Sequence, residues 1–185
     1  MRITLLAKRY AQALFDLSLE NKILEKVAQD MALVNEIVNE SRELRLMLSS
    51  PIIETRKKKI ILSKIFKGKI EDLSLRFILL ITRKGREKYI HYISKAFNDI
   101  YKDYKNIVDV MLTTTYKTDK EVKDSVLKLM ADITSKNIEL EELIDDELIG
   151  GFVINLEDYQ YDASIKTQLK RLKKEFSENL YIQKY

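Results

Sequence analysis

The sequence predicts a mainly α protein, with an N-terminal six-helix bundle over residues 1–105 followed by a small α+β domain over residues 106–185. Apolar residues recur at three- and four-residue steps through the first hundred residues, which is the period of amphipathic helices. At Asn106 the pattern becomes alternating, as it is in strands. Since 45% of the 185 residues are hydrophobic, the chain is long and apolar enough to bury a core.

The first three helices are predicted from their apolar faces and from possible capping residues. Asn21 is a candidate N-cap for the second helix, and Ser41 for a short third helix that ends near Leu48. Pro51, the only proline, cannot continue that helix, so a break is expected there. The apolar face of the first helix is expected to hold Leu6, Tyr10, Ala13, Leu14 and Leu17, and that of the second Leu24, Val27, Met31, Val34 and Val38.

Three more helices complete the predicted bundle. A fourth helix follows Thr55 and ends at Gly68, a fifth runs from about Glu71 to Lys84, and a sixth from about Glu87 to Tyr104. Gly85 closes the fifth helix. The buried stripes are expected at Ile60, Ile61, Ile65 and Phe66 in the fourth helix, and at Tyr89, Ile93, Phe97 and Ile100 in the sixth.

The fifth helix is apolar around more of its circumference than its neighbours. Its apolar residues do not fit one narrow stripe: Leu73, Leu75, Phe77, Ile78, Leu79, Leu80 and Ile81. A helix of this kind is either central in the fold or covered by a partner.

The second half is predicted to be a small α+β unit. Residues 107–113 are rich in β-branched side chains and indicate a strand, and 151–156 form a second strand candidate after a glycine pair. Between them, Asp119 can cap a helix that reaches Ile133, and residues 138–143 alternate imperfectly. A final helix, capped by Asp162 or Ser164, carries Ile165, Leu169, Leu172 and Phe176 on one face.

The charge of the chain differs between its halves. Residues 1–105 hold 22 Lys and Arg against 13 Asp and Glu, a net charge of +9, whereas residues 106–185 hold 11 against 16, a net charge of −5. The acidity is concentrated in residues 106–162, with 14 acidic against 5 basic residues. Solvated strand and loop edges are the favoured interpretation of these carboxylates, and an acidic patch that faces a basic partner is the alternative that the charge imbalance supports.

No catalytic, cofactor or metal site is predicted. The chain has no Cys and a single His, His91, which lies in a predicted helix without a triad pattern. Its four glycines do not form a phosphate-binding loop, and the carboxylates of residues 139–142 and 145–147 lack the spacing of a calcium loop. The sequence also contains no apolar run of about 18 residues and no secretory signal.

Two basic clusters leave an alternative function open. Residues 56–59 and 170–174 are runs of Lys and Arg that a helical nucleic-acid-binding protein, or another adaptor protein, could use. In both clusters apolar positions interleave with the charges, as on solvated helix faces. No nucleic-acid-binding motif accompanies them, so a nucleic-acid partner is not expected.

Four motifs, in this order along the chain, resemble those of one known family. They are Arg9-Tyr10-Ala11-Gln12-Ala13-Leu14-Phe15, Arg83-Lys84-Gly85-Arg86, Leu148-Ile149-Gly150-Gly151-Phe152-Val153-Ile154 and Asp162-Ala163-Ser164-Ile165. Together they make the chain similar, over nearly its whole length, to the delta subunit of F-type ATP synthase, the bacterial homologue of the mitochondrial oligomycin-sensitivity-conferring protein. The motif residues with an expected structural role are Arg9, Phe15, Gly85, Arg86, Gly150, Gly151, Asp162 and Ser164.

The resemblance implies a non-catalytic stator subunit that needs no cofactor. The domain over residues 1–105 would bind the N-terminal segments of alpha subunits in the catalytic head, and residues 106–185 would bind the b subunits of the peripheral stalk. The head-binding residues implied are Tyr10, Ala13, Leu14, Leu79 and Leu80, for each of which bundle packing is the competing interpretation. One copy per complex is implied, peripheral on the cytoplasmic side of the bacterial inner membrane and without a membrane span.

Overall fold

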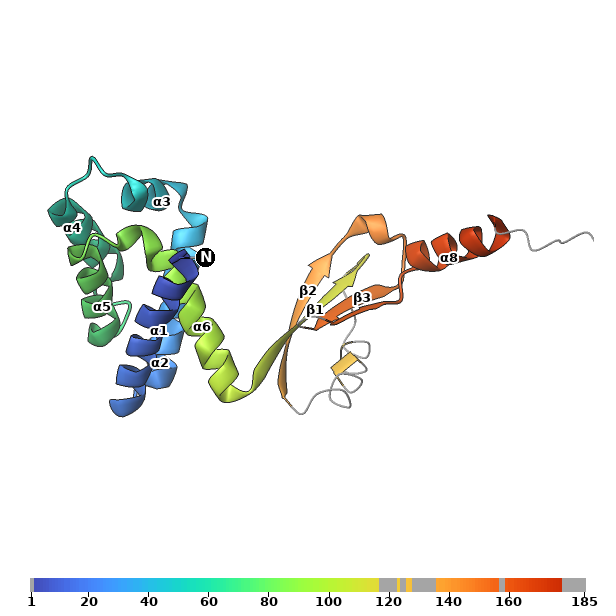
Figure 1. Cartoon of the computed structure of the whole chain (residues 1–185), viewed down its shortest axis with the longest axis horizontal. Coiled ribbons are helices and arrows are strands. Elements are labelled where there is room, and N and C mark those ends of the chain that lie inside the picture. Colours follow the sequence, from blue (N-terminus) through green and yellow to red (C-terminus); the bar gives the residue numbers. More distant parts are fainter. Residues whose placement is uncertain (1, 117–122, 124–125, 128–135, 157–158, 178–185) are drawn as a thin grey trace, which may run out of the picture. The chain divides into compact units, whose positions relative to one another are not determined.

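The protein is mainly helical, with a four-stranded sheet toward its C-terminus, in a computed structural model (Figure 1). The structure describes residues 2–116, 123, 126–127, 136–156 and 159–177. The chain divides into two compact units, Met1–Tyr104 and Lys105–Tyr185, and each unit is described by itself below.

The first unit is built from helices around one apolar core. The helices are α1 (Arg2–Glu20), α2 (Leu24–Glu40), α3 (Arg42–Ser49), α4 (Thr55–Phe66), α5 (Asp72–Arg83), the 3₁₀ turn η1 (Glu87–Tyr89) and α6 (Ile90–Lys105). Its largest fully buried side chains are Leu14, Met31, Leu62, Phe66, Ile78, Ile81, Ile93 and Phe97. Because these residues come from α1, α2, α4, α5 and α6, the core joins all five helices.

The predicted caps of the first unit are partly confirmed. The Ser41 Oγ accepts a hydrogen bond of 3.1 Å from the backbone amide of Leu44, so Ser41 is the N-cap of α3 as expected. The prediction that Asn21 caps α2 is wrong. The Asn21 side chain donates to the carbonyl of Leu17 at 2.8 Å, and Lys22 follows with a φ of 56°, so Asn21 ends α1 instead.

The buried stripe of α4 differs from the predicted one. Ile60 is 49% exposed and Ile61 is also exposed, whereas Lys58, Leu62 and Phe66 are buried. The prediction failed because it placed every Lys on the solvated face, and Lys58 instead belongs to the i, i+4, i+8 stripe that faces the core.

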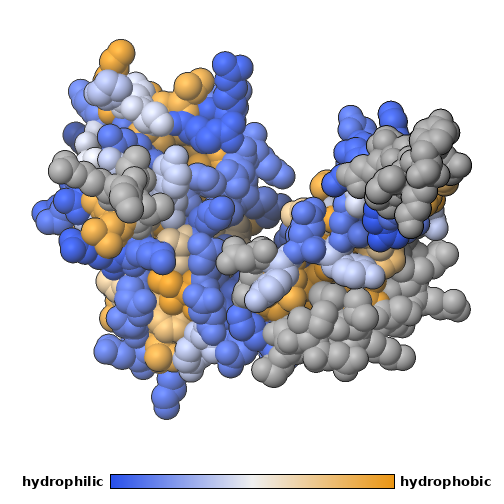
Figure 2. All heavy atoms as spheres, turned by 45° about the vertical axis from the view of Figure 1, so that its right-hand side comes forward, coloured by the Kyte–Doolittle hydropathy of each residue, from blue (hydrophilic) through white to orange (hydrophobic). Residues whose placement is uncertain are grey.

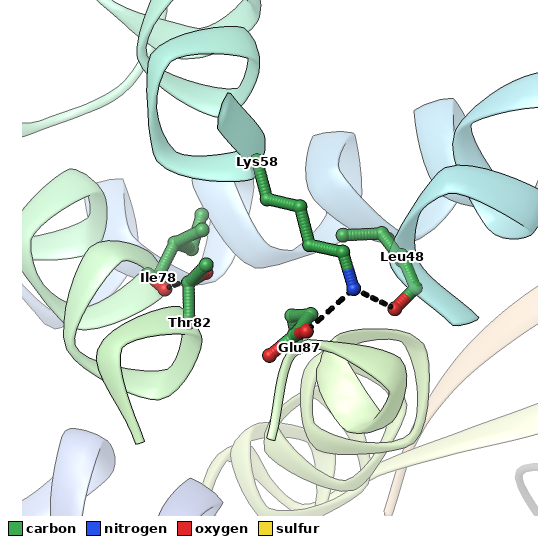
Figure 3. A network of polar contacts seen from close by, with 5 residues as sticks. All are labelled: Leu48, Lys58, Ile78, Thr82 and Glu87. Atoms are coloured by element: carbon green, nitrogen blue, oxygen red, sulfur yellow. Dashed lines mark hydrogen bonds and ion pairs between the residues drawn. The ribbon is translucent and has the colours of Figure 1, made fainter. Parts of the chain in front are cut away.

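Lys58 is accommodated in the interior by two hydrogen bonds (Figure 3). Its Nζ lies 2.6 Å from Oε1 of Glu87 in η1 and 3.0 Å from the carbonyl oxygen of Leu48 in α3. The contacts join α4 both to the preceding helix, α3, and to the later turn η1. A buried ammonium needs partners of this kind because burial of an unpaired charge is very costly.

The second unit contains a mixed sheet with strand order β2-β1-β3-β4. The strands are β1 (Ile107–Thr114), β2 (Asn137–Ile144), β3 (Phe152–Leu156) and β4 (Tyr159–Asp162), and η2 (Asp146–Leu148) and helix α8 (Ile165–Ser177) complete the described elements. β1 pairs with β2 in parallel and with β3 antiparallel, and β3 pairs antiparallel with β4.

The strands predicted near residues 107–113 and 151–156 are confirmed. The imperfectly alternating segment is the edge strand β2, and β4 was not predicted because all four of its side chains are exposed. The predicted helix from Asp119 to Ile133 lies outside the described residues, apart from three helical positions at 123, 126 and 127. One of these, Val126, is buried against the core of Val108, Val110, Leu112, Ile154 and Leu156.

Candidate functional site

A partly exposed aromatic contact joins α1 to α5 in the first unit. The rings of Tyr10 and Phe77 meet edge to face, with centroids 6.5 Å apart and planes at 62°. The guanidinium of Arg86 lies 5.5 Å from the centre of the Tyr10 ring and also donates to the Tyr10 hydroxyl. These contacts hold a large amphipathic side chain at the surface between two helices, a position suited to binding a protein partner.

The turn after α5 places Arg86 over Tyr10. Gly85 has a φ of 66°, and its amide donates to the carbonyl of Thr82 at 3.1 Å. The amide of Arg86 donates to the carbonyl of Ile81, also at 3.1 Å. These two bonds form a Schellman motif, which confirms that Gly85 closes the helix and explains why Arg86 follows it in a fixed position.

The predicted head-binding residues of α1 do not all share one face. Tyr10 is half-buried and Ala13 is exposed, but Leu14 is only 1% exposed. Leu14 is therefore a core residue and has no surface to offer a partner, which corrects its assignment. On a helical wheel Leu6, Tyr10, Ala13 and Leu17 share the flank beside the core, and we call this flank the α1 stripe.

The two predicted residues of α5 lie on opposite flanks of that helix. Leu80 is 45% exposed and follows Phe77 by one helical turn, so it lies on the flank that meets α1. Leu79 is half-buried and lines an open groove with Ile60 of α4. Leu79 therefore does not join the surface formed by Tyr10, Ala13 and Leu80.

These two flanks explain the broad apolar circumference of α5. Buried Ile78 and Ile81 face the core, Leu75 and Leu79 share the α4 side, and Phe77 and Leu80 share the α1 side. Sequence reasoning missed Phe77 as a site residue. Its spacing from Leu73 and Leu80 was the available signal, because residues three and four apart share a helix face.

The remaining motif residues of α1 have separate environments. Phe15 is buried and packs against Phe97 and Tyr104 of α6, with ring centroids 6.1 and 5.3 Å apart, so it joins α1 to α6. Arg9 is exposed, and its structural role stays a prediction.

In the second unit, the two C-terminal motifs contact each other. The amide of Ile165 donates to the carbonyl of Gly150 at 3.0 Å, and the amide of Ala163 donates to Phe152 at 2.9 Å. A Cβ on Gly151, whose φ is 78°, would lie 2.4 Å from the carbonyl oxygen of Ala163. The glycine pair therefore lets the start of α8 lie directly against the start of β3.

Asp162 and Ser164 both cap the start of α8. The Ser164 Oγ accepts from the amide of Thr167 at 3.2 Å, which makes Ser164 the N-cap. Asp162 accepts from the amide of Ser164 at 2.8 Å and from the Thr167 hydroxyl at 2.7 Å. Hydrogen bonds from Ser164, and then from Thr167, lower the pKa of Asp162 because they stabilise its charged form.

Helix α8 carries an apolar face that is largely exposed. Ile165, Leu169, Leu172 and Phe176 recur at steps of four, three and four, and all are exposed, Phe176 by 84%. We call these four residues the α8 stripe. Figure 2 shows patches of hydrophobic residues between hydrophilic ones on one face of the molecule. An exposed stripe on a helix is typical of a surface that a partner helix covers.

The described residues contain no group of three or more His, Cys, Asp or Glu side chains placed to hold a metal ion. In this described part, no helix is long and apolar enough to span a membrane. Burial, followed by the charges of Lys95 and Arg45, lowers the pKa of His91, so its imidazole is neutral at neutral pH.

Comparison with known proteins gives one consistent family. The model described as "ATP synthase delta (OSCP) subunit" matches residues 6–176. A protein named "ATP synthase subunit delta" from Cytophaga hutchinsonii is 34% identical over 97% of this chain and 98% of its own length. A second protein of that name, from Christiangramia forsetii, is 33% identical over 100% of both chains.

A solved structure shares the fold. One chain of the cryo-EM structure of the Toxoplasma gondii mitochondrial ATP synthase hexamer superposes with a TM-score of 0.69. The two are 23% identical in sequence, and the match covers 95% of this chain and 99% of that one.

Proposed function

The chain belongs to the ATP synthase delta (OSCP) subunit family, and we propose that its two units hold two different parts of the F-type ATP synthase. It is a non-catalytic stator subunit. Rotation of the central shaft exerts torque on the catalytic head, which would turn with the shaft unless an outer stalk held it. The chain is the joint between the head and that stalk, and it couples rotation to ion transport by resisting this torque.

The six helices of the first unit bind the head, through the N-terminal segments of its alpha subunits. The observation that carries this assignment is the half-exposed contact of Tyr10 with Phe77, flanked by exposed Ala13 and Leu80. The α1 stripe and the α1-facing flank of α5 form the two sides of an apolar surface that an amphipathic helix can cover. The Tyr10 ring supplies the large contact area typical of a binding hot spot.

Arg86 prepares this surface for the partner. Its guanidinium contacts both the face and the hydroxyl of Tyr10, so the ring is held in place before binding. A side chain that is already ordered loses less conformational entropy when the partner binds. The roles expected of Gly85 and Arg86 thereby become specific: the glycine turn positions the arginine, and the arginine positions the tyrosine.

The second unit binds the b subunits of the peripheral stalk. The α8 stripe supports this assignment, since its apolar side chains repeat at the spacing that packs against another helix. The Gly150–Gly151 pair and the caps at Asp162 and Ser164 fix the start of α8, and so fix the direction of the stripe. The chain is present in one copy per complex and lies at the periphery of the bacterial inner membrane, on its cytoplasmic side.

Binding of the first unit to the head is tested by calorimetric titration of the Ala13→Arg variant into catalytic heads that lack this subunit. A large side chain at Ala13 occupies the apolar surface, so we expect affinity to fall by at least about tenfold. Gln12→Arg is the matched control, because Gln12 is exposed on the other side of α1. Equal affinities for the two variants would refute the assignment, and a stoichiometry other than one per head would refute the copy number.

The stalk assignment is tested in the same way with the soluble part of the b subunits. Leu169→Asp places a charge in the α8 stripe and is expected to abolish binding, whereas Gln168→Asp adds the same charge beside it and is expected to bind as the unmodified chain does. If the acidic stretch of residues 106–162 contributes, affinity also falls as salt rises. An affinity independent of salt removes the electrostatic part of the proposal.

A further inference from the structure

The open groove lined by Leu79 and Ile60 lies on the first unit, between α4 and α5. It has a volume of about 490 Å³ and is open to solvent, and its lining residues are Lys59, Ile60, Ser63, Lys64, Lys67 and Leu79. We call it the lysine groove. It is separate from the surface formed by Tyr10, Ala13 and Leu80, because Leu79 lies on the opposite flank of α5.

The lysine groove combines an apolar floor with a basic rim. Ile60 and Leu79 supply the floor, and Ile60 is an exposed β-branched side chain that the core does not use. The three lysines supply the rim. No Asp or Glu lines the groove, and none of these lysines forms an ion pair within the part of the chain that the structure describes.

The C-terminal end of α4 also carries more lysines than are needed to complement its helix dipole. Lys64 is in the last turn of α4 and Lys67 is its C-cap residue, where one positive charge already complements the helix dipole. Three ammonium groups around one apolar depression repel one another, and an anionic partner relieves that repulsion.

We propose that the lysine groove binds an acidic amphipathic segment of a protein partner. Apolar side chains of that segment occupy the floor against Ile60 and Leu79, and carboxylates beside them pair with the lysines. A groove between two packed helices suits a third helix, which presents apolar residues at i, i+3 and i+4 with charged residues on either side.

The shape and the floor favour this occupant over two other anionic partners. A lipid surface is broad, and binds basic residues that project from a convex face, not residues that surround a depression. A nucleic acid is held mainly through its phosphates, and an apolar floor adds nothing to that contact. The inference does not depend on the head or stalk assignments, since the residues of the groove belong to neither surface.

The proposal is tested on the full chain with a fluorescent synthetic helix as the probe. The probe carries leucines along one face and glutamates on both sides of them, and binding is read by fluorescence anisotropy at several salt concentrations. We expect saturable binding that weakens as salt rises. Two comparison peptides, one with alanines for the leucines and one with lysines for the glutamates, are each expected to bind at least tenfold more weakly.

Variants of the chain locate the binding site. Lys64→Glu with Lys67→Glu reverses two rim charges and is expected to weaken binding roughly tenfold or more at low salt. Lys57→Glu with Lys95→Glu is the matched control, with the same change of net charge at exposed positions outside the lining. Ile60→Ser removes the exposed part of the floor and is expected to weaken binding as well, while circular dichroism verifies that each variant is folded.

Three kinds of result would overturn the proposal. The first is an absence of binding by the acidic helix to the unmodified chain. The second is equal binding by the two charge-reversed double variants, or loss of binding in Ala13→Arg but not in Lys64→Glu with Lys67→Glu, which would move the site elsewhere. The third is lysine-dependent sedimentation with vesicles of an anionic phospholipid in the absence of peptide binding, which would make the groove a lipid site.

Discussion

The Nζ of Lys58 lies 2.6 Å from Oε1 of Glu87, and both side chains are buried within the helical unit. The pair joins α4 to the turn that begins α6, and the second bond of Lys58, to the carbonyl of Leu48, adds α3. Three segments separated in sequence are thereby fixed relative to each other. The Oε2 of Glu87 has no hydrogen-bond partner among the described residues. Lys58 therefore provides most of the interaction that offsets the cost of burying this carboxylate.

Removal of Lys58 is therefore expected to destabilise the protein strongly. Lys58→Met leaves Glu87 buried without its counter-charge, a situation that costs on the order of 3–5 kcal/mol in the free energy of unfolding. Urea unfolding followed by circular dichroism measures the loss. The double variant Lys58→Met with Glu87→Leu removes both charges and is expected to recover most of it. A single variant as stable as the unmodified chain would show that the pair does not hold the segments together.

Gly151 and Gly68 provide a matched pair of glycines. Both have positive φ, 78° and 80°, but a Cβ would lie 2.4 Å from Ala163 at Gly151 and would meet nothing within 4 Å at Gly68. Gly68→Ala should therefore cost only the backbone strain, about 1 kcal/mol. Gly151→Ala should cost clearly more, because the start of α8 has to move away from β3.

Hydrogen exchange of α8 and β3 amides distinguishes these two variants. We expect faster exchange across both segments in Gly151→Ala and unchanged exchange there in Gly68→Ala. Equal effects of the two substitutions on the second unit would contradict the close contact between the two C-terminal motifs.

Lys22 is expected to be replaceable by glycine with a gain in stability. It follows α1 with a φ of 56°, its amide donates to Leu19 and that of Ile23 donates to Ser18, at 3.1 and 3.0 Å. This is a Schellman motif with a non-glycine residue at the left-handed position. Lys22→Gly should raise the free energy of unfolding by about 0.5–1 kcal/mol, measured in urea. Lys22→Ala keeps the Cβ and should not stabilise the protein. If both variants were more stable than the unmodified chain, removal of the lysine charge would explain the effect.

Asp162 gives the start of α8 a dependence on pH. Its pKa in the folded chain is lowered below the ordinary value of about 3.9, so the ionised carboxylate stabilises the fold above that pH. That contribution is lost as pH falls through the folded-state pKa. As pH is lowered through the folded-state pKa, the protection factors of the Ser164 and Thr167 amides should fall more in the unmodified chain than in Asp162→Asn. An equal fall in both chains would assign the pH dependence to other carboxylates.

Periodicity was sufficient to predict the helices, because an apolar face is a local pattern. It was insufficient wherever a tertiary contact decides the outcome. Lys58 is buried only because Glu87 and Leu48 meet it, and Asn21 ends α1 because the left-handed Lys22 follows it. Neither of these contacts has a signature in the residues on either side.

The site shows the same limit. Five residues were predicted to bind the head, and three of them, Tyr10, Ala13 and Leu80, lie on one surface. Leu14 and Leu79 are equally apolar, but Leu14 is buried in the core and Leu79 lines the groove beside α4. Successive side chains on a helix point in directions about 100° apart, so an apolar residue next to one on a partner surface can lie in the core. The contact between Gly150 and Ile165 accompanies the pairing of β3 with β4, and β4 was not predicted because it is only four residues long and fully exposed.

The central claim, that the two units bind different parts of the complex, is tested most directly by titrating each of two variants against both partners. Ala13→Arg and Leu169→Asp are each titrated calorimetrically into subunit-depleted heads and into the soluble part of the b subunits. We predict that Ala13→Arg loses the head and keeps the stalk, and that Leu169→Asp does the reverse. Loss of both partners in either folded variant, or of neither partner in both, would contradict the assignment.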